Sequence, residues 1–283
     1  MNHPKHTKQA TAETNKRIRT GILIGVIICG VLLLSHIPAI MTGTVVILNT
    51  LAVYELFRAA HMLSERKLLS GMLIASVVVS LLPVPEYGTV LAYVFPLSAL
   101  IFAHIMRRCG RCVLDVPLRI CGICGLVILL FKAVPAVRNL EHGFFCLLAA
   151  VLSGCVTDIF AYITGKAIGK HKLAPVISPK KTVEGSIGGI LGTVAVLLIL
   201  GFALEQANVV QVNFIALTFY AVLSSIVGQF GDLSMSSVKR CHGVKDYGTL
   251  FPGHGGILDR FDSLLFIAPF TCLFCRHIGP FFL

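Results

Sequence analysis

Tryptophan is missing from this chain of 283 residues, and tyrosine occurs only six times. Because these residues form the aromatic belts that mark membrane interfaces, aromatic side chains cannot place such interfaces here. Charge is also scarce: only 13% of the residues are charged, and Asp and Glu together number 13. This shortage excludes an ordinary soluble domain.

Apolar residues, in contrast, are abundant. Apolar residues make up 56% of the chain, and its mean hydropathy is +0.87. Several apolar runs approach the roughly 20 residues that a helix needs to cross a bilayer, whereas a membrane β-barrel would show short alternating segments. We predict an all-α, polytopic integral membrane protein with about nine transmembrane helices. They are expected at residues 21–36, 40–57, 68–84, 88–106, 118–134, 142–164, 185–204, 212–231 and 261–279.

The basic residues predict the orientation. Residues 1–20 form a basic tail, and the next apolar run has no small-residue cleavage site, so we expect a retained first helix and no signal peptide. With the tail and alternate loops inside, all but three of the 24 Lys and Arg residues lie on the inner side, as the positive-inside rule requires. The N-terminus and two polar loops, residues 165–184 and 232–260, are therefore expected on the cytoplasmic face of the cell inner membrane.

No internal repeat or long linker divides residues 21–283, which we treat as a single membrane domain behind the cytoplasmic tail. The net charge of +11 is spread over several short loops, so it indicates orientation, and no nucleic-acid partner is expected. Gly185 and Gly189, and likewise Gly188 and Gly192, are four residues apart, which predicts close helix packing.

Ten cysteines raise the alternative of a zinc site. Cys109, Cys112, Cys121 and Cys124 form two C-x-x-C pairs, a pattern that can bind zinc. The second pair falls inside an apolar run, as do most of the other cysteines, so buried thiols are the favoured interpretation.

The few acids are unevenly distributed. Four of the thirteen lie within residues 232–262, at Asp232, Asp246, Asp259 and Asp262. Cations are interleaved with them, at Lys239, Arg240, Lys245, His254 and Arg260. Carboxylates suit Mg²⁺, and cations suit the phosphates that Mg²⁺ accompanies. The intervening F-P-G-H-G-G turn lets backbone N–H groups approach an anion. We predict a phosphate-handling site; a solvated turn whose charges mark the interface is the alternative.

The other polar loop is basic and precedes a predicted helix start. Ser178, Lys180, Lys181 and Thr182 come just before that start, and Glu184 falls near the first turn. Anions are favoured at helix N-termini, and a plain helix cap at Ser178 or Thr182 is compatible with that role.

Two further acids lie within predicted spans. Asp158 is expected to face inward as a ligand or an ion-pair partner, because acids in membrane spans usually face a cavity or a partner. Glu55 permits the same interpretation, or a side chain that snorkels to the interface beside Arg58.

The stretch S-S-V-K-R-C-H-G-V-K-D-Y-G-T-L-F-P-G-H-G-G-I-L-D-R-F-D, Ser236 to Asp262, resembles the signature of the phosphatidate cytidylyltransferases, also called CDP-diacylglycerol synthases. The segments G-D-L-S-M-S, I-S-P-K-K-T-V-E-G and D-I-F-A-Y resemble the same family. The resemblance is dense over residues 153–262 and identifies two catalytic segments, residues 153–189 and 231–262.

The resemblance implies transfer of CMP from CTP to phosphatidic acid, which yields CDP-diacylglycerol and pyrophosphate for phospholipid synthesis. The cofactor it implies is Mg²⁺, with a second cation as an open alternative. The expected partners are CTP, phosphatidic acid and membrane lipids, and a homodimer is a further alternative.

The resemblance also assigns roles to residues. The catalytic residues would be Asp232, Lys239, Arg240, Asp246, Asp259 and Arg260. Asp232 and Asp259 would bind the metal, with Asp246 and Asp262 as further candidates. The substrate-binding residues would be Ser178, Lys180, Lys181, Thr182, Glu184, Ser236, Lys245, His254, Gly255 and Gly256.

Three other functions stay open at this point. A CTP-dependent kinase of a polyprenol would share the CTP site but would need a base for its hydroxyl nucleophile and would release CDP. A synthase that uses an ether-lipid phosphate would share the chemistry. A transporter is disfavoured, because the polar residues gather at one membrane edge and the chain lacks matching interrupted halves.

Overall fold

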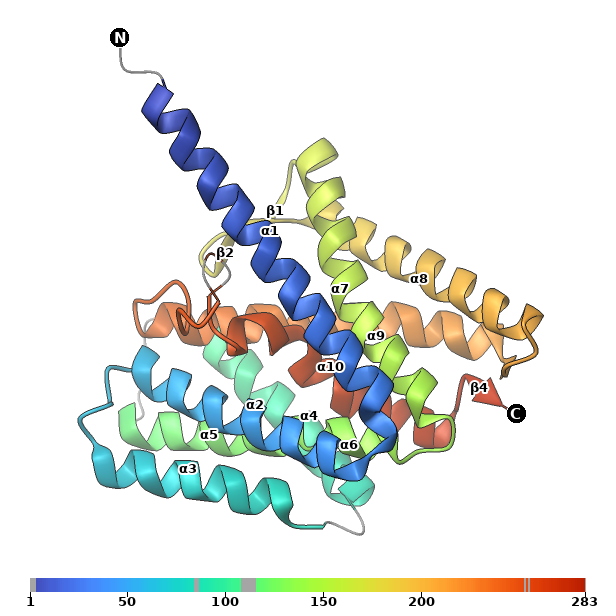
Figure 1. The fold of residues 1–283 in the computed structure, drawn as a ribbon, viewed down its shortest axis with the longest axis horizontal. Coiled ribbons are helices and arrows are strands. Elements are labelled where there is room, and N and C mark those ends of the chain that lie inside the picture. The colour runs from blue at the N-terminus through green and yellow to red at the C-terminus, as the bar shows by residue number, and fades with distance from the viewer. Residues whose placement is uncertain (1–3, 84–86, 108–115, 252, 254, 283) are drawn as a thin grey trace.

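The computed structural model describes residues 4–83, 87–107, 116–251, 253 and 255–282. Helices dominate it (Figure 1). The helices are α1 (Pro4–Leu33), α2 (Pro38–Ala59), α3 (Arg66–Leu81), α4 (Tyr87–Arg107), α5 (Val116–Phe131), α6 (Ala133–Arg138), α7 (Gly143–Ile168), α8 (Val183–Gln206), α9 (Phe214–Cys241) and α10 (Leu258–His277), with a 3-10 turn, η1 (Leu34–His36). The strands are β1 (Lys172–Ala174), β2 (Ser178–Thr182), β3 (Gln211–Val212) and β4 (Phe281–Phe282).

The predicted all-α polytopic architecture is confirmed, since a helix occupies every expected span. Within the described ranges, seven helices are long and apolar enough to cross a membrane: α1, α2, α4, α5 continued by α6, α7, α8 and α9. The other two of the nine expected spans fall short for different reasons. Helix α3 has only 16 residues, and α10 carries Asp259, Arg260, Asp262 and Arg276. At 1.5 Å per residue, α3 covers about 24 Å, less than the hydrocarbon core of about 30 Å.

Contacts between connecting segments show that the helix ends gather at two opposite ends of the bundle. At one end, the α2 terminus meets the segment after α9, where Arg58 Nη1 donates to Thr249 Oγ1 at 3.4 Å. The start of α5 joins the same end, because Arg119 Nη2 lies 3.1 Å from His242 Nε2. We call this the polar end.

The second end holds connections between other helices. Arg138 Nε donates to Ser35 Oγ at 2.9 Å, and Asn213 N donates to Pro280 O at 2.9 Å. Lys132 Nζ donates to the carbonyl of Leu82 after α3. Successive helices therefore alternate in direction, α3 and α10 included. Lys132 and Arg138 belong to this second end, as the charge distribution predicted.

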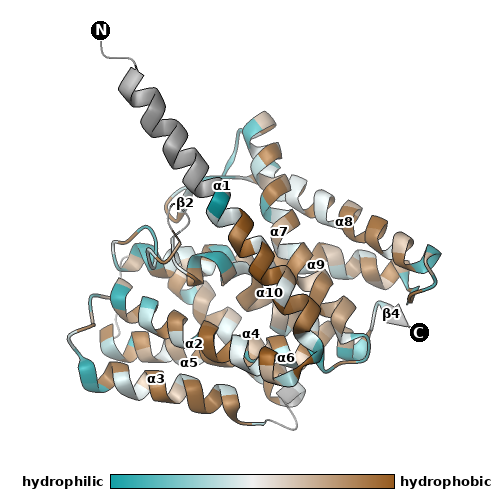
Figure 2. Ribbon diagram, viewed as in Figure 1, coloured by the Kyte–Doolittle hydropathy of each residue, from teal (hydrophilic) through white to brown (hydrophobic). Residues whose placement is uncertain are grey.

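Several helices extend beyond their predicted spans; α1 begins at Pro4, within the segment expected as a tail, and the extensions of α9 and α10 concern the site. The span expected at residues 212–231 is part of α9, which continues to Cys241, and α10 begins at Leu258, before the expected residue 261. Asp232 and Asp259 are therefore helical residues, although they were expected in a loop. Figure 2 shows hydrophilic residues at this end of α9 and in the connection between α2 and α3, while hydrophobic residues cover most helix bodies.

The basic loop before α8 forms a short hairpin that the sequence did not predict. Strands β1 and β2 pair antiparallel, with Lys172 opposite Thr182 and Ala174 opposite Ser178. Thr182 is the N-cap of α8 and accepts a hydrogen bond from Gly185 N at 3.1 Å. The hairpin therefore passes directly into the helix, and the predicted cap at Thr182 is confirmed.

Glycines bring α7 and α8 close together, as the four-residue spacing predicted. A Cβ atom built at Gly189 would lie 2.9 Å from the backbone oxygen of Thr157, and one at Gly188 or Gly192 would meet the side chain of Thr164 or Phe160. Across the same interface Thr157 and Thr193 join their hydroxyls at 2.8 Å. This packing holds α7, which carries Asp158, against α8.

Replacing Gly189 with alanine is expected to destabilise the protein. Alanine normally favours a helix over glycine by about 1 kcal/mol, but here the new methyl group would push against backbone. Gly43→Ala on α2 is the matched control, because nothing lies within 4 Å of its built Cβ atom. Thermal unfolding in detergent should show a lower midpoint for Gly189→Ala and an equal or higher one for Gly43→Ala. Equal midpoints for Gly189→Ala and the unchanged protein would refute close packing there.

Candidate active site

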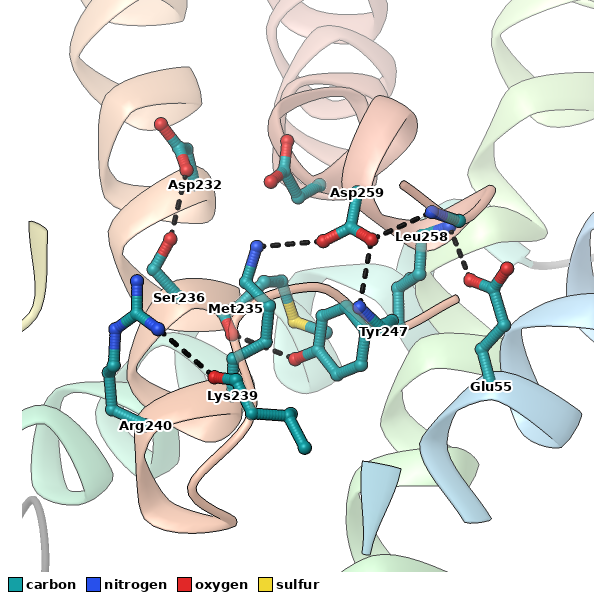
Figure 3. Close-up of polar contacts among 12 residues, drawn as sticks. Glu55, Asp232, Met235, Ser236, Lys239, Arg240, Tyr247, Leu258 and Asp259 are labelled. Atoms are coloured by element: carbon teal, nitrogen blue, oxygen red, sulfur yellow. Dashed lines mark hydrogen bonds and ion pairs between the residues drawn. The ribbon is translucent and has the colours of Figure 1, made fainter. Parts of the chain in front are cut away.

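Asp259 is the centre of a buried polar cluster at the start of α10. Its Oδ1 accepts a hydrogen bond from Lys239 Nζ at 2.8 Å, and its Oδ2 accepts from the backbone N–H groups of Tyr247 and Gly256, each at 2.8 Å (Figure 3). The Asp259 side chain is only 3% exposed and that of Lys239 is 9% exposed. One carboxylate thus joins α9, the segment after it and the glycine turn into one unit.

Glu55 of α2 supports this unit from the other side. Its Oε1 accepts from Ile257 N at 2.8 Å and its Oε2 from Leu258 N at 2.9 Å, so the carboxylate caps the first turn of α10. A side chain on Gly256 would collide with the Glu55 carboxylate. Of the two predicted alternatives, the structure supports an inward-facing acid with partners, since Glu55 is 4% exposed. No sequence signal shows that its partners lie about 200 residues away.

Glu55→Gln is expected to weaken α10 at its start. A glutamine has one acceptor oxygen for the two N–H groups, so one buried donor loses its partner, at a cost of about 1 to 3 kcal/mol. Glu65→Gln, at the exposed N-cap of α3, is the control because Glu65 makes no capping hydrogen bond there. A lower unfolding midpoint for Glu55→Gln alone would support the cap. The same small change in both variants would argue against it.

Asp232 joins α9 to the hairpin. Its Oδ2 forms an ion pair with Lys181 Nζ of β2, and its Oδ1 accepts from Ser236 Oγ, one helical turn later, at 3.2 Å. This contact brings together the two catalytic segments that the resemblance identified.

Two more acids lie around Asp232. Asp262 of α10 is 7% exposed and accepts from its neighbour, Ser263 N, at 2.8 Å. Asp158 of α7 and Asp262 both lie close enough to Asp232 to interact with it electrostatically. Three helices therefore direct carboxylates toward one region, and the cations Lys181 and Lys239 border it.

A cavity of about 260 Å³ lies between α7 and the hairpin. Asp158, Lys180, Lys181 and Thr182 line it, together with Gln229 of α9. Cations and amide or hydroxyl groups around one carboxylate give a cavity that suits phosphate oxygens. We call this space the hairpin cavity.

Two of the predicted substrate-binding residues have other roles. Glu184 accepts from the backbone N–H groups of Lys170 and His171 and lies 2.6 Å from His171 Nδ1, so it holds the start of the hairpin. Ser178 pairs with Ala174 in the hairpin, and neither Glu184 nor Ser178 is among the residues that line the hairpin cavity.

The other predicted site residues lie at separate places around this cluster. Arg240 donates to Ile177 O at 3.2 Å and to Val244 O at 3.0 Å, so it ties the hairpin to the segment after α9. Asp246 lines a different cavity, of about 560 Å³, with Arg58 and His61. Gly255 has a φ of +83°, which only glycine adopts easily. Lys245 is exposed, and Arg260 is exposed on the first turn of α10. His254 lies outside the described residues.

Tyr247 is a buried polar residue that the sequence prediction missed. Its hydroxyl donates to Met235 O at 2.7 Å, and Lys239 Nζ lies 5.3 Å from the centre of its ring. Burial, followed by the nearby Asp259 charge, raises the pKa of Tyr247 well above its usual value of 10. The phenol therefore stays protonated and donates to the α9 backbone, with its ring beside Lys239.

Metal ligands are not preassembled. Among the residues that the structure describes, no three His, Cys, Asp or Glu side chains lie close enough together to hold a metal ion. Asp232 and Asp259, the predicted ligand pair, instead engage Lys181 and Lys239. Of the four cysteines in the zinc alternative, Cys109 and Cys112 lie outside the described residues. Cys121 and Cys124 are part of α5.

The fold and this cluster define a class: a multi-span membrane protein whose acids and cations converge at one end in an arrangement that suits phosphate ligands. The comparison with known families agrees. The profile of the Cytidylyltransferase family matches residues 15–278, and the chain belongs to that family.

Curated relatives carry a more specific name than the family does. The chain is 47% identical over 129 residues to "Phosphatidate cytidylyltransferase" of Staphylococcus haemolyticus, a match that covers 46% of this chain and 48% of the relative. It is 44% identical over 135 residues to the protein of that name from Bacillus subtilis, covering 47% and 49%. The chain thus spans about half the length of the curated relatives it matches.

Proposed function

We propose that this protein transfers the cytidylyl group of CTP to phosphatidic acid and releases pyrophosphate. The observation that carries the proposal is the convergence of Asp158, Asp232 and Asp262 from three helices, bordered by Lys181 and Lys239. Family membership and the names of the relatives support the same activity.

The chemistry suits the residues present. A phosphate oxygen of phosphatidic acid would form a bond to the α-phosphorus of CTP, while the bond from that phosphorus to the bridging oxygen of the β-phosphate breaks and its electron pair leaves with pyrophosphate. The attacking phosphate is already ionised near neutral pH, so no strong base is needed. Positioning and neutralisation of charge are the main tasks. Lys181 and Lys239 are placed for neutralisation, since binding of phosphates could draw them from Asp232 and Asp259.

A divalent cation fits the acids at this site. Mg²⁺ is commonly held by one or two carboxylates together with substrate phosphates, so a group of three protein ligands is not required. Asp232 and Asp262 would hold it, with Asp158 and Asp259 beside them, and a second cation would find further carboxylate oxygens there. The metal would stabilise charge on the phosphates as pyrophosphate leaves.

The polar end is proposed to face the cytoplasm, where CTP is found, with the N-terminus on the same side. The sequence predicts most Lys and Arg residues in the loops at this end, as on the inner side of membrane proteins. The membrane would supply phosphatidic acid, and a homodimer stays a prediction.

The direct test uses membranes that contain the protein, CTP labelled at its α-phosphorus, phosphatidic acid and Mg²⁺. Label should appear in the lipid fraction as CDP-diacylglycerol, in proportion to the amount of protein. Membranes that lack the protein provide the background. No labelled lipid from well-folded protein would overturn the proposal.

Removal of divalent cations is expected to reduce transfer by about a hundredfold or more, because the carboxylates would then repel the phosphates of CTP. Treatment with EDTA followed by dialysis should abolish labelling, and added Mg²⁺ should restore it. Equal activity before and after EDTA treatment would contradict a metal at these acids.

A further inference from the structure

Besides the hairpin cavity, the structure has an apolar groove among the helices. The groove has a volume of about 330 Å³ and lies between α1, α2, α7 and α10; Figure 1 shows α1 crossing in front of α10. Ile24, Ile28 and Val31 of α1 face it at helical spacing. The hydroxyl of Thr44, which also lines the groove, donates to Ile40 O of its own helix at 2.8 Å. The groove walls therefore suit a hydrocarbon chain.

The groove opens toward the membrane along α1. On the other face of this helix, Ile22, Leu23 and Val26 are 62%, 53% and 63% exposed, as expected for side chains that contact lipid. Ile27 of α1 and Ile47 of α2 also line the groove and are 50% and 59% exposed, so the groove is open between these two helices.

The other end of the groove leads toward the acids. A smaller cavity of about 70 Å³ shares Ile28, Val151, Phe261 and Leu264 with the groove. The smaller cavity is also lined by Asp158 and Arg260. We call it the neck. Asp158 lines both the neck and the hairpin cavity, so the two spaces meet at this carboxylate.

Arg260 is the cation at this junction. Within the described part of the chain, its guanidinium makes no hydrogen bond or ion pair, whereas Lys181 and Lys239 are paired with Asp232 and Asp259. A guanidinium offers a planar fork that matches two phosphate oxygens. A ligand with a hydrocarbon chain at one end and a phosphate monoester at the other fits the groove, neck and Arg260 in that order.

We propose that one acyl chain of phosphatidic acid lies in the groove between α1, α2, α7 and α10, and that its phosphate binds Arg260. This inference rests on the proposed function and divides the cations between the substrates. Arg260 binds the phosphate of the lipid at the neck. Lys180 and Lys181 bind phosphates of CTP in the hairpin cavity. Asp158 lies between the two phosphates that react.

The first kinetic test uses a variant in which a larger side chain narrows the neck. Val151→Phe should raise KM for phosphatidic acid with 16- or 18-carbon chains by about tenfold or more, because a bulky ring competes with the chain. KM for CTP and KM for dihexanoyl phosphatidic acid should change little. Ile159→Phe is the matched control, because Ile159 lies on the same helix but is 54% exposed and lines neither the groove nor the neck. Equal effects of the two variants, or no dependence on chain length, would overturn the proposal.

A second kinetic test addresses the phosphate. Arg260→Gln should raise KM for phosphatidic acid by about tenfold or more and change KM for CTP much less, since charge-assisted contacts to the lipid would be lost. Lys180→Gln, in the hairpin cavity, should show the reverse pattern. A rise in KM for CTP alone in Arg260→Gln would reassign Arg260 to the nucleotide.

A binding test needs no turnover and stays informative if Val151→Phe fails to fold. The unchanged protein in nanodiscs is irradiated with phosphatidic acid that carries a diazirine in one acyl chain. Cross-links should concentrate on α1, α2, α7 and α10 and disappear with excess unlabelled phosphatidic acid, but not with phosphatidylcholine. Labelling spread over the exposed face of α8, or not displaced, would refute the groove. If cross-links map to the groove while no CDP-lipid forms, the proposed function fails and the lipid site stands.

Discussion

Asp232→Asn should lower cytidylyl transfer by about a thousandfold or more while the protein still folds and enters the membrane. The substitution removes the charge that is central among Asp158, Asp262 and Lys181. An asparagine oxygen can still accept the hydrogen bond from Ser236 Oγ. The Lys181 side chain is 25% exposed, so water can replace its lost partner at little cost in stability.

The measurement is kcat with labelled CTP, beside the midpoint of thermal unfolding in detergent. Glu141→Gln controls for the loss of a negative charge, because the Glu141 side chain is 85% exposed before α7 and makes no contact with the polar end. It should retain the activity of the unchanged protein. If Asp232→Asn kept activity within tenfold, Asp232 would be removed from the reaction centre.

Lys239→Met is expected to give the largest loss of stability. It leaves the charge of Asp259 buried without its cation, a situation that typically costs about 3 to 5 kcal/mol. The remaining partners of Asp259, Tyr247 N and Gly256 N, are neutral and offset only part of this cost. Lys172→Met, at an exposed position of β1, should leave the unfolding midpoint unchanged.

A double variant separates the buried charge from a loss of packing. Lys239→Met combined with Asp259→Asn removes both charges and should recover much of the stability, with strong coupling between the two sites. The double variant should nevertheless be inactive, because it lacks two groups of the reaction centre. A single Lys239→Met variant as stable as the unchanged protein would mean that the two charges are not buried together.

The membrane architecture could be predicted because it depends on composition along the chain. Apolar runs and basic loops indicated every long helix and the alternation of their ends, which the contacts of Arg58, Arg138 and Asn213 confirm. Span boundaries were less predictable. Helix α9 continues past residue 231 because Asp232, Ser236 and Lys239 lie on one of its faces, while Met235 and Val238 are buried on another. A criterion based on hydropathy ends the helix where those polar residues begin.

The partners within the site could not be predicted from the sequence. The resemblance grouped residues 153–189 with residues 231–262, but only the three-dimensional packing of α7, α8 and α9 pairs Lys181 with Asp232. Glu55 was left with two interpretations because its partners, Ile257 N and Leu258 N, are backbone groups that any residue could supply. The hairpin before α8 was missed because three- and five-residue strands around Pro175 and Pro179 carry little signal.

The most direct test of cytidylyl transfer follows two phosphorus labels of CTP in one reaction. The protein is given phosphatidic acid, Mg²⁺ and CTP that carries one phosphorus isotope in the α-phosphate and another in the γ-phosphate. We predict that the α-label enters the lipid and the γ-label leaves in pyrophosphate, in equal amounts. Appearance of the γ-label in a lipid, with the α-label released in CDP, would contradict cytidylyl transfer and identify a CTP-dependent lipid kinase.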